Sequence, residues 1–194
     1  MLSVLERPTL RARVSRMSVA EYHQLGEFNE HGRRTELIRG IVVEKMSKSH
    51  LHSSIATLLY RLILARIPDG YSAWKEEPLT LRDSEPEPDI SVVKADWTAH
   101  DRGHPVTAAL IIEVAVTNPD DDRALAEIYA EAGVGEYWVV LPKERSIEVF
   151  RLPEGLAYRE VRRYEFTDDL TSSTVPGVKF TLSELFAGIA PAGT

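Results

Sequence analysis

Leucine and isoleucine recur three or four residues apart in one long segment of the chain, residues 51–65. This spacing is typical of an amphipathic helix with one buried face, and the Pro-Asp-Gly sequence at 68–70 is expected to end it. A second helix is predicted at about 121–132, with Gly133 in a position where glycine commonly terminates helices.

The most apolar stretch, residues 108–116, does not alternate between apolar and polar positions. Both faces of such a strand are expected to be covered, as in a central strand of an α/β sheet. Two apolar runs flank Arg39-Gly40, which predicts a strand pair joined by a tight turn. The other predicted elements are a short helix opened by the capping-box pair Ser18 and Glu21, a closing helical turn at 181–185, and strands at 71–74, 79–81, 90–93, 137–140, 147–151 and 158–164.

This order of helices and strands predicts an α/β or α+β fold, in which helices flank a central mixed β-sheet. The chain of 194 residues is read as one domain, residues 17–194, preceded by an arm at 1–16 that shows no periodicity and is expected to be mobile. It contains no cysteine, which excludes disulfides, thiolate zinc sites and cysteine nucleophiles. Any metal ion must therefore be held by carboxylates, carbonyls or histidine.

Charge is distributed unevenly along the chain, whose formal net charge is −7. The arm carries four arginines (7, 11, 13 and 16) against Glu6, so the remaining residues are strongly acidic. An acidic body argues against a protein that grips DNA by charge alone, and it suits an enzyme that needs carboxylates. No uncharged run reaches the ~18 apolar residues of a membrane span, and no secretory signal pattern is recognised, so a cytoplasmic location is expected.

Glu113 stands out because it lies inside the apolar stretch at 108–116. An unpaired ionised carboxylate in such a strand would cost several kcal/mol, and its pKa would rise instead. A functional site open to water or a cation would explain it, and so would a salt bridge or the exposed end of the strand. The strand alone does not decide between these interpretations.

Asp89 follows a proline at the start of the predicted strand 90–93, and Glu113 comes 24 residues later on another strand. Taken alone, Asp89 is best read as a loop aspartate, but two adjacent strands that each present a carboxylate make a plausible divalent-cation site. Glu36 is a third candidate ligand or a solvent-facing residue of its strand. His52, near the start of the long helix, is a candidate metal ligand, phosphate contact or capping residue.

Six short motifs follow one another along most of the chain: E-L-I-R-G at 36–40, K-M-S-K-S-H-L-H at 45–52, P-D-I-S-V-V at 88–93, H-P at 104–105, I-I-E-V-A at 111–115 and Y-A-E-A-G-V-G-E-Y-W-V-V at 129–140. Together they resemble the Uma-type restriction endonuclease family of the PD-(D/E)XK nuclease superfamily, over residues 17–185. The resemblance implies a central mixed sheet flanked by helices, DNA as the substrate and a homodimer.

The resemblance also implies roles for the candidate residues. Asp89 matches the aspartate of the PD motif, Glu113 the downstream acidic residue, and Glu36 the glutamate of the N-terminal element. These three are the expected ligands of Mg²⁺ or Mn²⁺, while His52 matches the histidine that opens the following helix. Such an ion polarises a phosphate oxygen and lowers the pKa of a bound water.

The chain departs from the family pattern at the lysine. The superfamily position holds Ala115, and the alternative position in the next helix holds Leu125. Arg123 is the nearest cation in sequence and is expected to substitute in part. Lysines 45, 48 and 94 are the others that could reach the site.

Three hypotheses follow. The first is a divalent-metal-dependent endonuclease in which the arginine-rich arm and Arg123 supply phosphate contacts. The second is a catalytically impaired relative that binds metal or nucleic acid, which the missing lysine and the net charge favour. The third is hydrolysis of a smaller phosphate substrate.

Overall fold

A six-stranded mixed β-sheet forms the centre of the molecule, as the apolar runs predict. The computed structural model describes residues 7–26, 34–94 and 103–189. The strands of the sheet are β3 (Tyr71–Lys75), β4 (Ile90–Lys94), β5 (Leu110–Val114), β6 (Glu136–Leu141), β7 (Ser146–Glu154) and β8 (Ala157–Tyr164). They lie side by side in chain order, and only the β5–β6 pair is parallel. Every residue of β5 and β6 is buried, so both faces of these central strands are covered.

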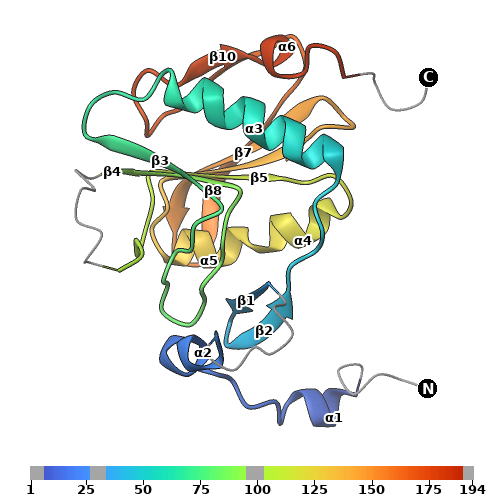
Figure 1. Cartoon of the computed structure of the whole chain (residues 1–194), viewed down its shortest axis with the longest axis vertical. Coiled ribbons are helices and arrows are strands. Elements are labelled where there is room, and N and C mark those ends of the chain that lie inside the picture. Colours follow the sequence, from blue (N-terminus) through green and yellow to red (C-terminus); the bar gives the residue numbers. More distant parts are fainter. Residues whose placement is uncertain (1–6, 27–33, 95–102, 190–194) are drawn as a thin grey trace.

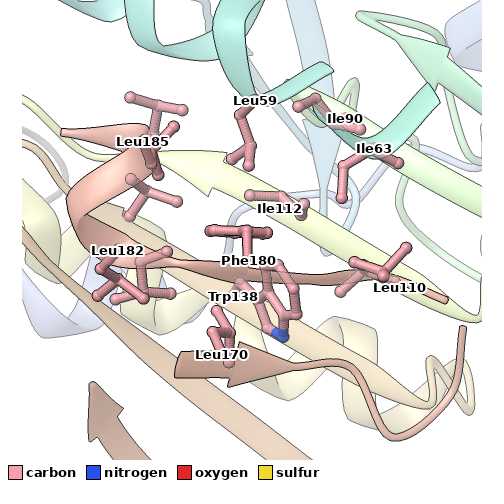
Figure 2. Close-up of a cluster of buried hydrophobic side chains, with 14 of the residues drawn as sticks. Leu59, Ile63, Ile90, Leu110, Ile112, Trp138, Leu170, Phe180, Leu182 and Leu185 are labelled. Carbon is pink, nitrogen blue, oxygen red and sulfur yellow. The ribbon is translucent and has the colours of Figure 1, made fainter. Parts of the chain in front are cut away.

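Helix α3 (His50–Leu64) lies across one face of the sheet, together with the C-terminal elements (Figure 1). The side chain of Ser49 caps it by accepting a hydrogen bond from the His52 N–H. Leu59 and Ile63 of α3 join Trp138 of β6 in a buried cluster (Figure 2). The cluster is closed by α6 (Leu182–Leu185) and by the hairpin of β9 (Asp169–Thr171) and β10 (Lys179–Thr181).

Helices α4 (Pro119–Ala124) and α5 (Ala126–Glu131) cover the opposite face (Figure 1). The prediction of one continuous helix here was wrong at Leu125, whose N–H bonds the carbonyl three residues back instead of four. The predicted helix end at Gly133 is confirmed: φ is 69° there, and the Gly133 N–H donates to the Ala130 carbonyl. A residue with a side chain would be strained in this left-handed conformation.

A separate two-stranded sheet, β1 (Thr35–Ile38) and β2 (Ile41–Glu44), lies on the α4–α5 side of the main sheet (Figure 1). The predicted tight turn is confirmed, with positive φ at both Arg39 and Gly40. Such a two-residue turn matches the twist of the strands it joins. The hairpin is anchored to the body because Leu37 is fully buried and its carbonyl accepts a hydrogen bond from the Glu85 N–H.

The N-terminal segment packs beside this hairpin. Helix α2 (Val19–Gly26) begins with the predicted capping box, in which the Ser18 N–H donates to Glu21 at 2.7 Å and the Glu21 N–H donates to Ser18 at 3.2 Å. Within the arm, the structure has one helical turn, α1 (Pro8–Arg11), none of whose residues is buried. None of the helices in the described ranges has the length and apolar character needed to cross a membrane.

Two other strand predictions differ from the structure. The predicted strand 79–81 is a loop with buried leucines, and the Leu79 N–H donates to the carbonyl of Pro86. Pro86 has no N–H to return the bond, so no ladder forms. The strands β9 and β10 were not predicted, because three residues are too few to show a period of two.

Candidate active site

Asp89 and Glu113 meet at one end of the main sheet. Ile90 of β4 pairs with Ile112 of β5 in antiparallel register. Asp89, which precedes Ile90, therefore lies opposite Glu113, which follows Ile112. The Asp89 N–H donates to Glu113 Oε2 at 3.1 Å, and the Val114 N–H donates to Asp89 Oδ2 at 2.9 Å. Both side chains are buried. Two carboxylates that are 24 residues apart in sequence therefore lie next to each other, both buried, at the sheet end.

Two side chains contact Asp89, one from the connection that precedes α3 and one from the first turn of α3. Lys48 Nζ donates to Asp89 Oδ1 at 2.8 Å, and His52 Nε2 lies 2.9 Å from Asp89 Oδ2. Burial opposes ionisation, but the contacts with His52 and Lys48 lower the pKa of Asp89 to about 2. This carboxylate is ionised at neutral pH, and both of its oxygens accept hydrogen bonds.

Glu113 has the opposite electrostatic setting. Its Oε1 accepts a hydrogen bond from the Tyr129 hydroxyl at 3.1 Å, but no cation contacts it among the described residues. Burial and the neighbouring charges of Asp89 and Asp122 raise the pKa of Glu113 well above its ordinary value. Nearby negative charge disfavours a second charge in the same place, so a cation placed between the carboxylates would be bound favourably.

Asp122 is a candidate site residue that sequence reasoning missed, because three successive aspartates at the start of a helix are typical of a charge cluster that interacts with the helix dipole. Burial and the charges of Asp89 and Asp121 raise its pKa to about 7. The useful signal was the short connection from β5 to α4, residues 115–118, which keeps the start of α4 close to the strand end that carries Glu113.

Replacing Asp122 by asparagine is expected to change how stability depends on pH. The pKa of about 7 in the folded chain exceeds the ordinary 3.8, so the folded state binds this proton more tightly. The contribution of Asp122 to the free energy of unfolding therefore falls as pH rises from about 4 to about 7. The free energy of unfolding of Asp122→Asn should not show this decrease, so the variant should be more stable than the wild type at pH 8.

Urea unfolding at pH 5 and pH 8, with a chelator present, measures this effect. Asp120→Asn is the matched control, because Asp120 is an exposed aspartate on the same helix and its charge is not among the causes of the raised pKa of Asp122. Equal pH dependence in Asp122→Asn and in the wild type would contradict the assignment of Asp122 to the buried site.

Glu36 lies beside the pair without a direct bond to it. Its Oε1 accepts hydrogen bonds from Lys45 Nζ at 2.9 Å and from the Glu87 N–H at 2.7 Å. Its charge is close enough to contribute to the raised pKa of Glu113. Lys45 also bonds the Glu87 carbonyl at 2.8 Å, so Glu36 and Lys45 fasten β1 to the segment that leads into Asp89.

The structure does not bring Arg123 to the carboxylates. Its guanidinium forms a two-point ion pair with Glu148, at 2.7 and 2.8 Å, and a third bond to Asp120. Lys94 is exposed at the far end of β4. Of the lysines that the sequence offered, Lys45 and Lys48 are the two that reach the site.

The donor set fits Mg²⁺ or Mn²⁺ bound through two carboxylates. No three histidine, aspartate or glutamate side chains converge into a full metal cage within the part of the chain that the structure describes. Mg²⁺ commonly keeps several waters and takes only one or two protein carboxylates together with substrate phosphate oxygens. Asp89 and Glu113 supply such a pair, and Glu36 and Asp122 add negative charge around it.

The chain matches the model of a known protein family. The model of the Uma2 family, whose description is "Putative restriction endonuclease", matches residues 19–183. The chain belongs to the Uma2 family. No curated protein matches the chain.

A solved structure shows the fold of this Uma2 protein independently. It is a crystal structure of a "putative nuclease belonging to DUF820" from Anabaena variabilis. The two chains superpose with a TM-score of 0.72 over 90% of the present chain and 99% of the other, at 19% sequence identity. At this identity the likeness concerns the fold, which is a single domain with helices around a central mixed sheet.

Proposed function

We propose that this Uma2 protein is a divalent-metal-dependent endonuclease that hydrolyses DNA phosphodiester bonds. The observation that carries the proposal is the contact of Asp89 with Glu113 at the sheet end, where one carboxylate is ionised and the other has a raised pKa. Two neighbouring carboxylates repel each other when both are ionised, and a divalent cation bound between them offsets this repulsion. Family membership supports nucleic acid as the substrate.

Asp89 and Glu113 would hold Mg²⁺ or Mn²⁺, and Glu36 would assist through its charge. Such an ion polarises a phosphate oxygen and makes a bound water more acidic. His52 keeps Asp89 oriented, since its Nε2 lies 2.9 Å from Oδ2, and Tyr129 orients Glu113 by donating to Oε1. Outer contacts of this type commonly contribute about 10- to 100-fold in metal affinity or activity.

The arm is the proposed source of phosphate contacts. All four of its arginines are exposed, and none has an acidic partner within the described residues. The Met17 N–H donates to the Gly40 carbonyl at 2.9 Å, so the arm leaves the body at the hairpin that also carries Glu36. Exposed arginines without partners are free to bind the DNA backbone, which the acidic body would otherwise repel.

Replacing these four arginines by alanine is expected to weaken DNA binding and its dependence on salt. Each phosphate contact contributes about 0.9 to the slope of log K against log salt, so the slope should fall by up to about 3.6. Fluorescence anisotropy of a labelled duplex measures this in a Glu113→Gln background, which avoids cleavage. The matched control removes four exposed positive charges from β8 and β10: Arg159, Arg162, Arg163 and Lys179. An equal loss of slope in both variants would contradict a specific role for the arm.

The proposal includes a homodimer and a cytoplasmic location, where DNA is accessible. Ile41, Val42 and Val43 of β2 support the dimer, because all three apolar side chains are exposed on a strand at the edge of its sheet. Natural monomers usually protect such strands.

A second candidate is a catalytically impaired protein that keeps the fold and binds metal or nucleic acid. The observation that favours it is Leu125, which packs against an apolar cluster where the family resemblance places a lysine. Cleavage of supercoiled plasmid and single-stranded DNA in Mg²⁺ or Mn²⁺, at low salt, separates the two. The endonuclease cuts with either metal and stops when a chelator is added. Metal binding without cleavage would support the impaired protein instead.

A further inference from the structure

Lys48 occupies an unusual position for a lysine outside a helix or strand. It lies in the connection from β2 to α3, and its ammonium contacts Asp89 Oδ1 at 2.8 Å and Glu76 Oε1 at 3.1 Å. Only 20% of its side chain is exposed. Among the lysines and arginines that the structure describes, it alone contacts Asp89.

A metal ion that binds Asp89 meets donors already placed at both oxygens: Lys48 at Oδ1, and His52 and the Val114 N–H at Oδ2. The positive charge of the metal repels the Lys48 ammonium at Oδ1. The Val114 N–H is fixed in the backbone at the end of β5, and His52 is fixed in the first, capped turn of α3. Lys48 reaches Asp89 through a flexible four-carbon stem and can turn away without moving any element. It is the donor that a bound cation displaces most easily.

Other cations are poorly placed to act at the same point. Arg123 is held by Glu148 and Asp120, and Lys45 is held by Glu36 and the Glu87 carbonyl. Position 125 presents an apolar side chain. A displaced Lys48 would remain beside the carboxylate pair, within the length of its own side chain.

We propose that Lys48 leaves Asp89 when the metal binds and that its ammonium then bonds an oxygen of the phosphate under attack. This inference rests on the proposed nuclease function and assigns the phosphate-facing cation of that same site. Lys48 therefore has two roles: it neutralises Asp89 in the metal-free protein, and it stabilises negative charge on the phosphate during the reaction.

The test compares Lys48→Met with Lys75→Met. Lys75 also pairs with Glu76, at 3.3 Å, but has no contact with Asp89, so it controls for the loss of one charge nearby. Mn²⁺ binding is measured by isothermal titration calorimetry, and plasmid cleavage is measured at saturating Mn²⁺. Lys48→Met is expected to bind Mn²⁺ about 10-fold more tightly, because no charged hydrogen bond has to break. It should nevertheless cleave about 10²- to 10³-fold more slowly.

Lys75→Met should resemble the wild type in both measurements, and Lys48→Arg should keep more cleavage than Lys48→Met because it retains a charged donor. Circular dichroism and urea unfolding establish that each variant is folded. Tighter binding with unchanged cleavage, or weaker binding with lowered stability, would overturn the proposal and leave Lys48 as a structural ion pair. A wild type that binds metal and cleaves while Lys48→Met does both equally well would overturn only the role of Lys48. A wild type that neither binds Mn²⁺ nor cleaves would overturn the nuclease function itself.

Discussion

Replacing Glu113 by glutamine is expected to reduce metal-dependent cleavage by about 10³-fold, the upper range for removing one group that stabilises charge in the transition state. Glutamine keeps the shape of the side chain and its contacts, since its oxygen can accept from the Asp89 N–H while its amide donates to the Tyr129 hydroxyl. What is lost is the negative charge that holds the metal. Initial rates of plasmid nicking at saturating Mg²⁺ measure the effect.

The control for this variant is Glu148→Gln, which removes a carboxylate of β7 that pairs with Arg123 of α4. It should cleave at close to the wild-type rate, because Arg123 does not reach the carboxylate pair. Cleavage by Glu113→Gln at the wild-type rate would show that the activity belongs to another site or to a contaminant.

The second large effect is on stability, and it has opposite signs at two buried glutamates. Glu136 is fully buried, and its Oε1 accepts from Arg151 at 2.7 Å. Its Oε2 accepts from the Ser172 hydroxyl at 2.6 Å and from the Ser173 N–H at 3.0 Å. Glutamine has only one acceptor oxygen, so one of these two sets of donors would face another donor.

Glu136→Gln is therefore expected to lower the free energy of unfolding by about 3 kcal/mol or more, as when a buried ion pair loses one partner. Glu113→Gln should not lower it, and should raise it at pH 8, because burial and Asp89 raise the pKa of Glu113 and this carboxyl group therefore disfavours folding above its ordinary pKa. Urea unfolding of both variants at pH 8 with a chelator measures the difference. A loss of stability in Glu113→Gln equal to that in Glu136→Gln would mean that Glu113 is a structural residue.

The residues that the sequence identified most clearly are those whose local pattern already demanded an explanation. Glu113 breaks a continuous apolar strand, and Asp89 begins the strand that pairs with it, so their meeting follows from strand register alone. His52 was placed correctly at the start of the long helix, because the position depends on helical spacing and a serine cap. The central sheet was equally readable, since its buried strands carry long apolar runs.

The remaining site residues depend on contacts between distant segments, which spacing does not encode. Lys48 was one of three lysines that the sequence offered, and only the path of the β2–α3 connection selects it. Asp122 was not among the predicted site residues, because its burial depends on how α4 packs. Arg123 was chosen for its proximity in sequence, but it points to Glu148 on β7. In all three cases the position of the side chain depends on tertiary packing, which local sequence does not determine.

The most direct test of the central claim is to locate the metal. Crystals of the Glu113→Gln and wild-type proteins soaked in Mn²⁺ would be compared by anomalous diffraction. The account predicts a peak in the wild type that contacts carboxylate oxygens of both Asp89 and Glu113, and a weaker or absent peak in the variant. A wild-type peak that lies elsewhere, or no peak at a saturating Mn²⁺ concentration, would contradict the assignment of these two carboxylates to a metal centre.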